Sequence, residues 1–127
     1  MRAQIILALL IPFSVAAAQE FSQSASYPNA TRDPSHIWQD KWLKRFASRG
    51  KGADITEWTL KANGITYVIS QILSEDCSAQ LCPTRVVKLT LGAAPAVLVD
   101  DMMHLGATFK LDNDFITDGE YRFRITK

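Results

Sequence analysis

The stretch ITEWTLKANGITYVISQIL, residues 55–73, decides the expected fold of this chain. Asn63-Gly64 lies near its centre, and this dipeptide favours a type I′ turn because both of its residues tolerate a positive φ. On either side of it apolar and polar residues alternate, with Trp58 and Leu60 on one face of the first segment. This period of two is typical of strands, so we expect a β-hairpin at this point of the chain.

Two more strand pairs are expected after this hairpin. One joins residues 84–91 to residues 96–100, and the other joins residues 107–111 to residues 120–126 through a turn rich in aspartate. In the last strand Arg122 and Arg124 are expected to face solvent. The apolar residues that alternate with them are expected to face the core: Tyr121, Phe123 and Ile125. The three hairpins predict an antiparallel sheet of about six strands.

A helix is expected upstream of the first hairpin. Asp33 can cap its first turn, Pro34 suits the first helical position, and Gly50 is a natural stop. Apolar residues recur between them at helical spacing: Ile37, Trp38, Trp42, Leu43 and Phe46. This stripe is expected to pack on the sheet, the alternative being an exposed aromatic surface for a partner. Together these elements predict an α+β fold with one N-terminal helix packed on a face of the sheet, in a single small domain of residues 33–127.

Residues 1–18 have the layout of a secretory signal peptide. A short basic start precedes the apolar run of residues 5–13, and Ala16 and Ala18 fit the rule for small residues before a cleavage site. The alternative is a buried N-terminal helix. Residues 19–32 are rich in Ser, Ala and Asn without periodicity, so a flexible leader is expected there. The chain is therefore expected in the periplasm of a Gram-negative bacterium.

The charge of the chain is nearly balanced. Its 14 basic and 13 acidic residues give a net charge of +1, and loss of Arg2 with the signal peptide would leave 13 of each. A nucleic-acid partner usually requires a basic face, so none is expected. Beyond residue 18 we expect no membrane span, because no later segment is long and apolar enough.

The two cysteines, Cys77 and Cys82, lie in the stretch SEDCSAQLCPTR, residues 74–85. A redox pair more usually has two intervening residues, and a zinc site needs about four ligands, whereas only His36 and His104 could join this pair. Outside the cytosol an oxidised pair is the default. We therefore expect a disulfide that closes the end of a hairpin, either as a plain staple or as the clamp of a rigid recognition loop.

Two further clusters carry polar side chains. Asp100, Asp101 and His104 could do acid–base chemistry, although no motif marks a nucleophile beside them. The acidic residues within residues 112–120 match only the first positions of a calcium-binding loop, so a solvated turn is expected there.

The order of these features resembles the Ivy family of periplasmic inhibitors of vertebrate-type lysozyme. A Trp-bearing segment is followed by EWTLKANGITYVI (residues 57–69), a loop with four residues between its cysteines, and the strand TRVVKL (residues 84–89). The resemblance spans residues 42–100 and implies a disulfide-closed loop that projects into the lysozyme cleft. The family loop typically carries a histidine that meets the catalytic carboxylates. Here the loop reads Ser-Ala-Gln-Leu, so Ser78 and Gln80 would be neutral donors in its place.

The sequence thus predicts a secreted protein-binding module rather than an enzyme, with no metal or cofactor. Its expected partner is a protein, such as a lysozyme or another peptidoglycan-cleaving enzyme. The expected contact and supporting residues lie in or behind the loop: Ser78, Ala79, Gln80, Leu81 and Arg85. Two alternatives stay open. One is a small secreted hydrolase or metal-dependent enzyme that uses Asp100, Asp101 and His104, and the other is a periplasmic immunity protein against a secreted toxin.

Overall fold

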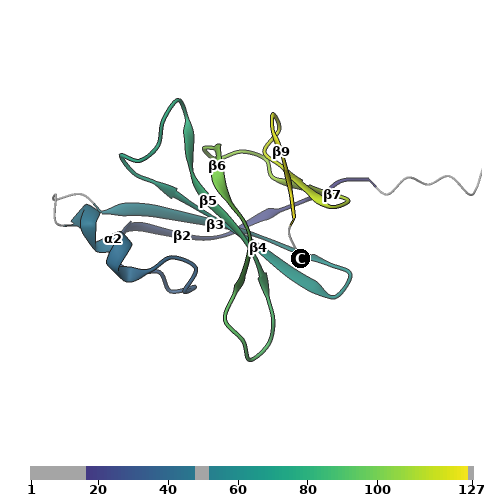
Figure 1. The fold of residues 1–127 in the computed structure, drawn as a ribbon, viewed down its shortest axis with the longest axis horizontal. Helices are drawn as coiled ribbons and strands as arrows, with labels where there is room; N and C mark the ends of the chain where they lie inside the picture. Colours follow the sequence, from purple (N-terminus) through teal and green to yellow (C-terminus); the bar gives the residue numbers. More distant parts are fainter. Residues whose placement is uncertain (1–16, 48–51, 126–127) are drawn as a thin grey trace, which may run out of the picture.

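The computed structural model describes residues 17–47 and 52–125 of the chain. Within these ranges it has one helix, α2 (Asp40–Ala47), and nine strands. In chain order the strands are β1 (Gln19–Glu20), β2 (Ser22–Ala30), β3 (Ala53–Ala62), β4 (Ile65–Leu73), β5 (Leu81–Leu89), β6 (Ala96–His104), β7 (Lys110–Asp112), β8 (Phe115–Thr117) and β9 (Arg122–Arg124) (Figure 1). Nearly all of the expected signal peptide, and the expected helix stop at Gly50, lie outside the described residues.

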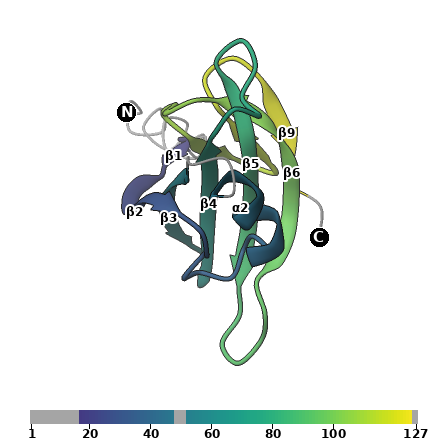
Figure 2. The same ribbon diagram turned by 90° about the vertical axis from the view of Figure 1, so that its left-hand side faces the viewer.

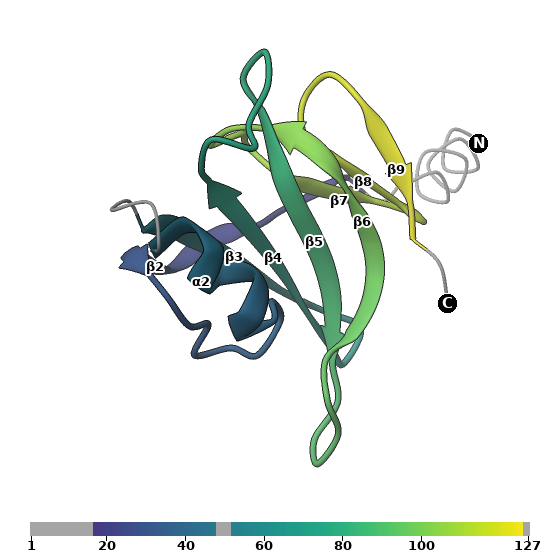
Figure 3. The same ribbon diagram turned by 60° about the vertical axis from the view of Figure 1, so that its left-hand side comes forward.

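The strands form two antiparallel sheets. The larger sheet has the order β2-β3-β4-β5-β6, and the smaller one has the order β1-β7-β8-β9. Helix α2 covers one face of the larger sheet and the smaller sheet packs on the other face, which gives three layers (Figure 2, Figure 3). The α+β prediction is therefore confirmed, with the strands divided between two sheets rather than gathered in one.

The turn at Asn63-Gly64 is where the sequence predicts it. Asn63 has a φ of 54° and Gly64 a φ of 75°, and β3 and β4 pair without a register shift from Ala62 opposite Ile65 to the far end of the hairpin. Because the register is unbroken, side chains along both strands alternate strictly between the two faces of the sheet.

Each face of the larger sheet carries a hydrophobic core. On one face Trp58, Ile69 and Val86 pack against Phe109 and Ile116 from the layer of the smaller sheet, and the Trp58 and Phe109 rings meet edge to face with centroids 4.8 Å apart. The opposite core joins α2 to the sheet through fully or nearly buried side chains: Leu43, Phe46, Ile55, Val68, Ile72 and Val87. The aromatic stripe thus packs on the sheet, as expected.

Helix α2 begins at Asp40 rather than at Pro34. His36 has a φ of 56°, which a right-handed helix does not accommodate. The Asp33 carboxylate orders a tight loop instead of a helical turn by accepting three backbone N–H groups at 2.8–2.9 Å, those of Ser35, Ile37 and Trp38. The described part of the chain contains no helix that is long and apolar enough to cross a membrane.

A buried carboxylate lies beneath this loop. Glu57 of β3 is 4% exposed, and its Oε1 accepts a hydrogen bond from the Ser35 hydroxyl at 2.8 Å. Its Oε2 has no hydrogen-bond partner among the described residues. Burial raises the pKa of Glu57, the Ser35 hydrogen bond partly opposes this shift, and the negative charge of Asp33 reinforces it. Ionisation of Glu57 is therefore less favourable in the interior than in water.

Residues 19–30 form β1 and β2, where the composition predicts a flexible leader. β1 pairs with β7 and β2 pairs with β3, and Phe21 between them is 4% exposed in the core. β2 is an edge strand with two register shifts and mostly exposed side chains. Such a strand needs no alternation of apolar residues, so periodicity does not reveal it.

The smaller sheet also differs from the expectation. β8 lies inside the stretch that is expected to be a turn, and it pairs with both β7 and β9. Phe123 and Ile125 pack on the core and Arg122 and Arg124 are exposed, as predicted. The inward prediction for Tyr121 is wrong, because this residue precedes β9 and is 48% exposed.

Candidate functional site

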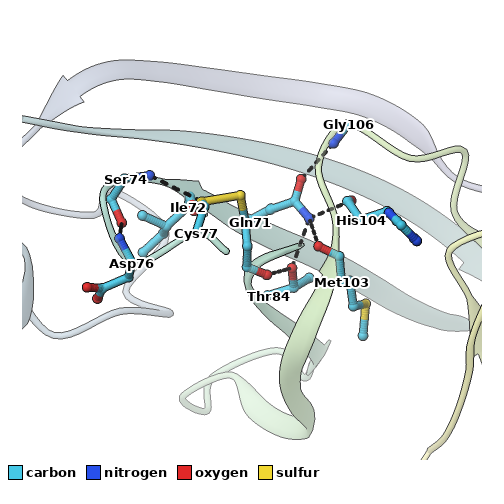
Figure 4. The surroundings of a disulfide bond; sticks show 10 residues. Gln71, Ile72, Ser74, Asp76, Cys77, Thr84, Met103, His104 and Gly106 are labelled. Carbon is cyan, nitrogen blue, oxygen red and sulfur yellow. Dashed lines mark hydrogen bonds between the residues drawn. A yellow bond between two sulfur atoms is a disulfide. The ribbon is translucent and has the colours of Figure 1, made fainter. Parts of the chain in front are cut away.

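Cys77 and Cys82 form the disulfide that the sequence predicts, and it closes a very small hairpin (Figure 4). Just inside it, Ser78 and Leu81 exchange two backbone hydrogen bonds of 2.8 and 2.9 Å. The cysteine Cα atoms are 4.3 Å apart, close to the separation of directly opposite residues that are not hydrogen-bonded to each other in an antiparallel pair. We call residues 77–82 the disulfide hairpin.

The turn of the disulfide hairpin consists of Ala79 and Gln80, whose φ values are 52° and 66°. Two successive positive values are typical of a type I′ turn, which usually contains Asn and Gly. The left-handed conformation costs a residue with a Cβ atom about 1–2 kcal/mol. The disulfide and the two hydrogen bonds at Ser78 hold the turn in this conformation, so the exposed residues 78–80 are presented in one shape.

The base of the disulfide hairpin is tied to helix α2. Asp76 forms an ion pair with Arg45 of the helix, and the Arg45 guanidinium also lies over the Trp42 ring, 4.5 Å from its centroid. Trp42 stacks on Trp38 with centroids 5.3 Å apart, and Arg85 of β5 lies over Trp38 at 4.4 Å. We call this row the arginine–tryptophan stack. It connects the hairpin base to β5 through the helix.

The hairpin tip is joined to the end of β6. Gln71, which is 2% exposed, donates from Nε2 to the His104 carbonyl at 2.9 Å and accepts the Gly106 N–H on Oε1 at 2.9 Å (Figure 4). The Leu105 N–H in turn donates to the Gln80 carbonyl at 2.8 Å. The tip and the β6–β7 connection therefore form one hydrogen-bonded unit.

Aromatic, apolar and charged side chains complete the surface beside the hairpin. His104 lies opposite Leu81 in the β5–β6 register, and its ring stacks on Tyr121 with centroids 5.8 Å apart. His104 Nε2 lies 2.5 Å from Glu120 Oε2, and Leu105 is 45% exposed. The negative charge of Glu120 raises the pKa of Tyr121. We call this set the loop surface: Ser78, Ala79, Gln80, Leu81, His104, Leu105, Glu120 and Tyr121.

Asp118 fixes the turn that carries Glu120 and Tyr121. Its carboxylate accepts the His104 N–H at 2.9 Å on Oδ2, and on Oδ1 it accepts the N–H groups of Glu120 at 3.0 Å and Tyr121 at 2.7 Å. Burial pushes the pKa of Asp118 upward, but the three N–H donors outweigh burial and the pKa is lowered. Ionised Asp118 thus holds the turn after β8 against the end of β6.

Arg85 lies outside the loop surface, on the helix-covered side of β5. Its Nη1 donates to the Ile37 carbonyl at 2.7 Å, and its Nε donates to Asp100 at 3.3 Å. It lines a groove of about 310 Å³ together with Trp38, Gln39, Trp42, Pro83 and Asp100. Its connection to the disulfide hairpin runs through the arginine–tryptophan stack, so it supports the hairpin base at a distance.

The structure does not bring Asp100, Asp101 and His104 together. Asp100 pairs with Arg85, Asp101 accepts the backbone N–H of Met102 at 2.8 Å, and the His104 ring pairs with Glu120. Asp100 and Asp101 are successive strand residues, so their side chains point to opposite faces. His104 lies four residues beyond Asp100, or about 13 Å along the strand. These three side chains therefore do not converge on one point.

The described residues, 17–47 and 52–125, contain no group of three or more His, Cys, Asp or Glu side chains placed to hold a metal ion. The acidic stretch of residues 112–120 is divided between β7, β8 and the turn that follows. Both oxygens of Asp118 are occupied by backbone N–H groups, which is a structural use of that carboxylate.

Comparisons with protein-family models, with curated proteins and with solved structures found no match for this chain.

Half of the loop surface could be predicted from the sequence. The four residues between the cysteines were expected to contact a partner. His104 was expected only in the alternative in which it acts with Asp100 and Asp101 in an enzyme. Leu105, Glu120 and Tyr121 were not expected, because they reach this surface through the β6–β7 connection and the second sheet. Long-range pairing of this kind leaves no local pattern that could have identified them.

Proposed function

We propose that this protein is a secreted, periplasmic protein-binding module that acts through the loop surface, and that its partner is a lysozyme-like, peptidoglycan-cleaving enzyme. The observation that carries the proposal is the turn of the disulfide hairpin, where two exposed residues are held at positive φ. Strain that the surroundings over-determine is found most often at ligand clamps and active sites. The resemblance to the Ivy family supports the choice of partner.

The loop surface has the properties of a small recognition site. The disulfide hairpin is narrow and already ordered, so little conformational entropy is lost when it enters a cleft. Ser78 and Gln80 carry a hydroxyl and an amide that can hydrogen-bond to carboxylates or amides of a cleft wall. Beside them Leu105 and Tyr121 offer exposed apolar area, and tyrosine is enriched among the residues that dominate binding energy.

The supports behind the loop surface favour binding over flexible gating. The disulfide, the ion pair between Asp76 and Arg45, and the hydrogen bond from Leu105 to Gln80 fix the hairpin from three directions. A loop fixed in this way suits a partner whose cleft is itself rigid, because both surfaces then bind with little rearrangement.

A binding titration against c-type lysozyme, with a lysis assay alongside, tests the proposal. We expect replacement of Gln80 and Leu81 by alanine to weaken binding at least tenfold, about 1.4 kcal/mol. Leu91→Ala, at the opposite end of the molecule, serves as the matched control and should bind like the wild type. Equal binding by both variants, or no binding by the wild type to lysozyme or to any other lytic enzyme, would overturn the proposal.

A periplasmic immunity protein would use the same kind of surface against a toxin. Capture from periplasmic extract, followed by identification of the retained protein, decides between these partners. If the retained protein is a toxin, and if it is retained only when the loop surface is intact, the loop surface remains the binding site but its partner is a toxin rather than a lytic enzyme.

A further inference from the structure

A second exposed feature lies at the end of the molecule opposite the loop surface. The connection between β5 and β6 projects beyond the rest of the larger sheet in every view (Figure 1, Figure 2, Figure 3). We call residues 89–97 the apolar finger. Leu91 is 103% exposed, and Leu89 and Val97 at its two sides are 41% and 48% exposed.

The apolar finger contains almost no polar side chains. No residue from 89 to 99 carries a charge, and Thr90 is the only one in that range with a hydrogen-bonding side chain. Every residue of the finger except Pro95 is exposed, so the finger has no core of its own. Contiguous exposed apolar surface on a small domain is typical of an interaction site.

Two lysines flank the base of the finger. Lys61, Thr66 and Leu89 stand in one row across β3, β4 and β5, and Lys88 stands in the next row. Successive rows point to opposite faces, so each face of the sheet has one lysine at this level. Beyond these lysines, β3 and β4 continue into the uncharged turn of residues 62–65, and β5 and β6 continue into the finger. This end of the sheet is thus an apolar tip above a cationic base.

We propose that the apolar finger inserts into the surface of a lipid bilayer that contains anionic lipids. In this position Leu89, Leu91 and Val97 contact the boundary between headgroups and acyl chains, and Lys61 and Lys88 lie at the level of the lipid phosphates. A specific protein partner would be recognised through hydrogen bonds and aromatic or arginine anchors, which the finger lacks. A bilayer surface requires neither.

The arrangement has two consequences. The finger has few apolar side chains, so its membrane association is weak and reversible, and it strengthens when salt is lowered. The disulfide hairpin lies at the other end of β5, so a protein held by its finger presents the loop surface away from the membrane (Figure 3). The membrane inference does not depend on the partner proposed for that surface.

Co-sedimentation with lipid vesicles tests the inference. The oxidised protein starting at Gln19 is mixed with vesicles of phosphatidylcholine and phosphatidylglycerol, and separately with vesicles of phosphatidylcholine alone. We expect sedimentation with the mixed vesicles, and a partition coefficient at least about tenfold lower for the variant Leu89→Asp/Leu91→Asp. The variant Lys61→Gln/Lys88→Gln should lose the preference for anionic vesicles and most of the salt dependence.

Leu105→Asp is the matched control, since Leu105 at 45% is about as exposed as Leu89 at 41% but lies on the loop surface. It should sediment like the wild type, and the thermal melting curves of all variants should agree because none of the altered side chains is buried. Sedimentation that the finger variant retains, or a wild type that stays in solution, would overturn the inference.

Light scattering without vesicles tests whether a second copy covers the finger instead. An apolar cavity of about 390 Å³ lies near the finger base and is lined by Ile65, Tyr67, Lys88, Ala96, Leu98 and Ile125. A monomer is expected. A dimer that Leu91→Asp dissociates would assign the finger to another copy of this chain and overturn the membrane inference.

Discussion

The Asp118 carboxylate, just after β8, holds the end of β6 and the turn before β9 in place. It accepts N–H groups from the end of β6 and from the turn before β9, and these bonds lower its pKa. Asp118→Asn keeps the size of the side chain but removes its charge and one acceptor atom. We expect this variant to lower the free energy of unfolding by about 1–3 kcal/mol at neutral pH.

The stability difference between the wild type and Asp118→Asn is expected to depend on pH. The folded-state pKa of Asp118 lies below its ordinary value of 3.8, so its stabilising contribution is complete above that value. The contribution disappears as the pH falls through the folded-state pKa. Urea unfolding of the wild type and Asp118→Asn should therefore differ at neutral pH and converge in strong acid. A difference that persists in strong acid would contradict the assignment.

Glu57 should show the opposite pH dependence. Burial raises its pKa above the ordinary value of 4.5, so its contribution is complete below 4.5 and is lost as the pH rises through the folded-state pKa. Glu57→Gln should gain stability relative to the wild type as the pH is raised from acid to neutral. Thermal melting at a series of pH values measures this change, and a difference from the wild type that does not grow with pH would contradict it.

Single residues were predictable where local chemistry decides their role. Asp33 does accept backbone N–H groups, as a cap would, but His36 at positive φ ends any helical turn there. Tyr121 follows the alternation of the last strand in sequence but lies before the strand begins. Its position depends on Asp118, and the alternation does not reveal that contact.

At the scale of the element, the turn of the disulfide hairpin makes the clearest prediction. Ala79→Asn with Gln80→Gly places residues that favour positive φ in a turn that already has that shape. We expect the double variant to raise the free energy of unfolding by about 1–2 kcal/mol in urea titrations. A loss of stability would show that the side chain of Ala79 or Gln80 stabilises the hairpin.

Binding of the same double variant shows whether the partner recognises the backbone shape of the turn or the Gln80 side chain. If the Gln80 amide contacts the partner, binding weakens although the hairpin is more stable. Gln80→Asn with Ala79 unchanged is the control, since it keeps an amide at the tip.

Elements with strong local patterns could be predicted, and the others could not. The Asn63-Gly64 hairpin and the pair formed by β5 and β6 follow from alternation and turn residues. β2 and β8 were missed because an exposed edge strand and a strand of three residues between aspartates carry no such pattern. Their existence depends on the partners with which they pair.

At the scale of the whole molecule, the two sheets depend on each other. The strands of the smaller sheet are two or three residues long, and such strands are not stable alone. Phe109 is fully buried between the sheets and contacts Trp58. We expect Phe109→Ala to cost about 3–5 kcal/mol. Unfolding should remain one transition, with tryptophan fluorescence and far-UV circular dichroism changing together.

Val97→Ala is the comparison for this variant, because Val97 is exposed and should cost little. A separate early transition of the smaller sheet in Phe109→Ala would contradict the interdependence of the layers. The division into two sheets was not predictable, because β1 at residues 19–20 pairs with β7 at residues 110–112. Nothing local to either segment encodes that contact.

The measurement that tests the central claim most directly is a binding titration of the oxidised protein and its Cys77→Ser/Cys82→Ser variant against c-type lysozyme. If the disulfide hairpin is a presented recognition loop, the variant should retain the fold, as seen by circular dichroism, and bind at least about tenfold more weakly, with the loss appearing in the binding entropy. Equal affinity of the two proteins, or no binding by the oxidised protein, would contradict the claim and leave the disulfide as a staple at the end of the sheet.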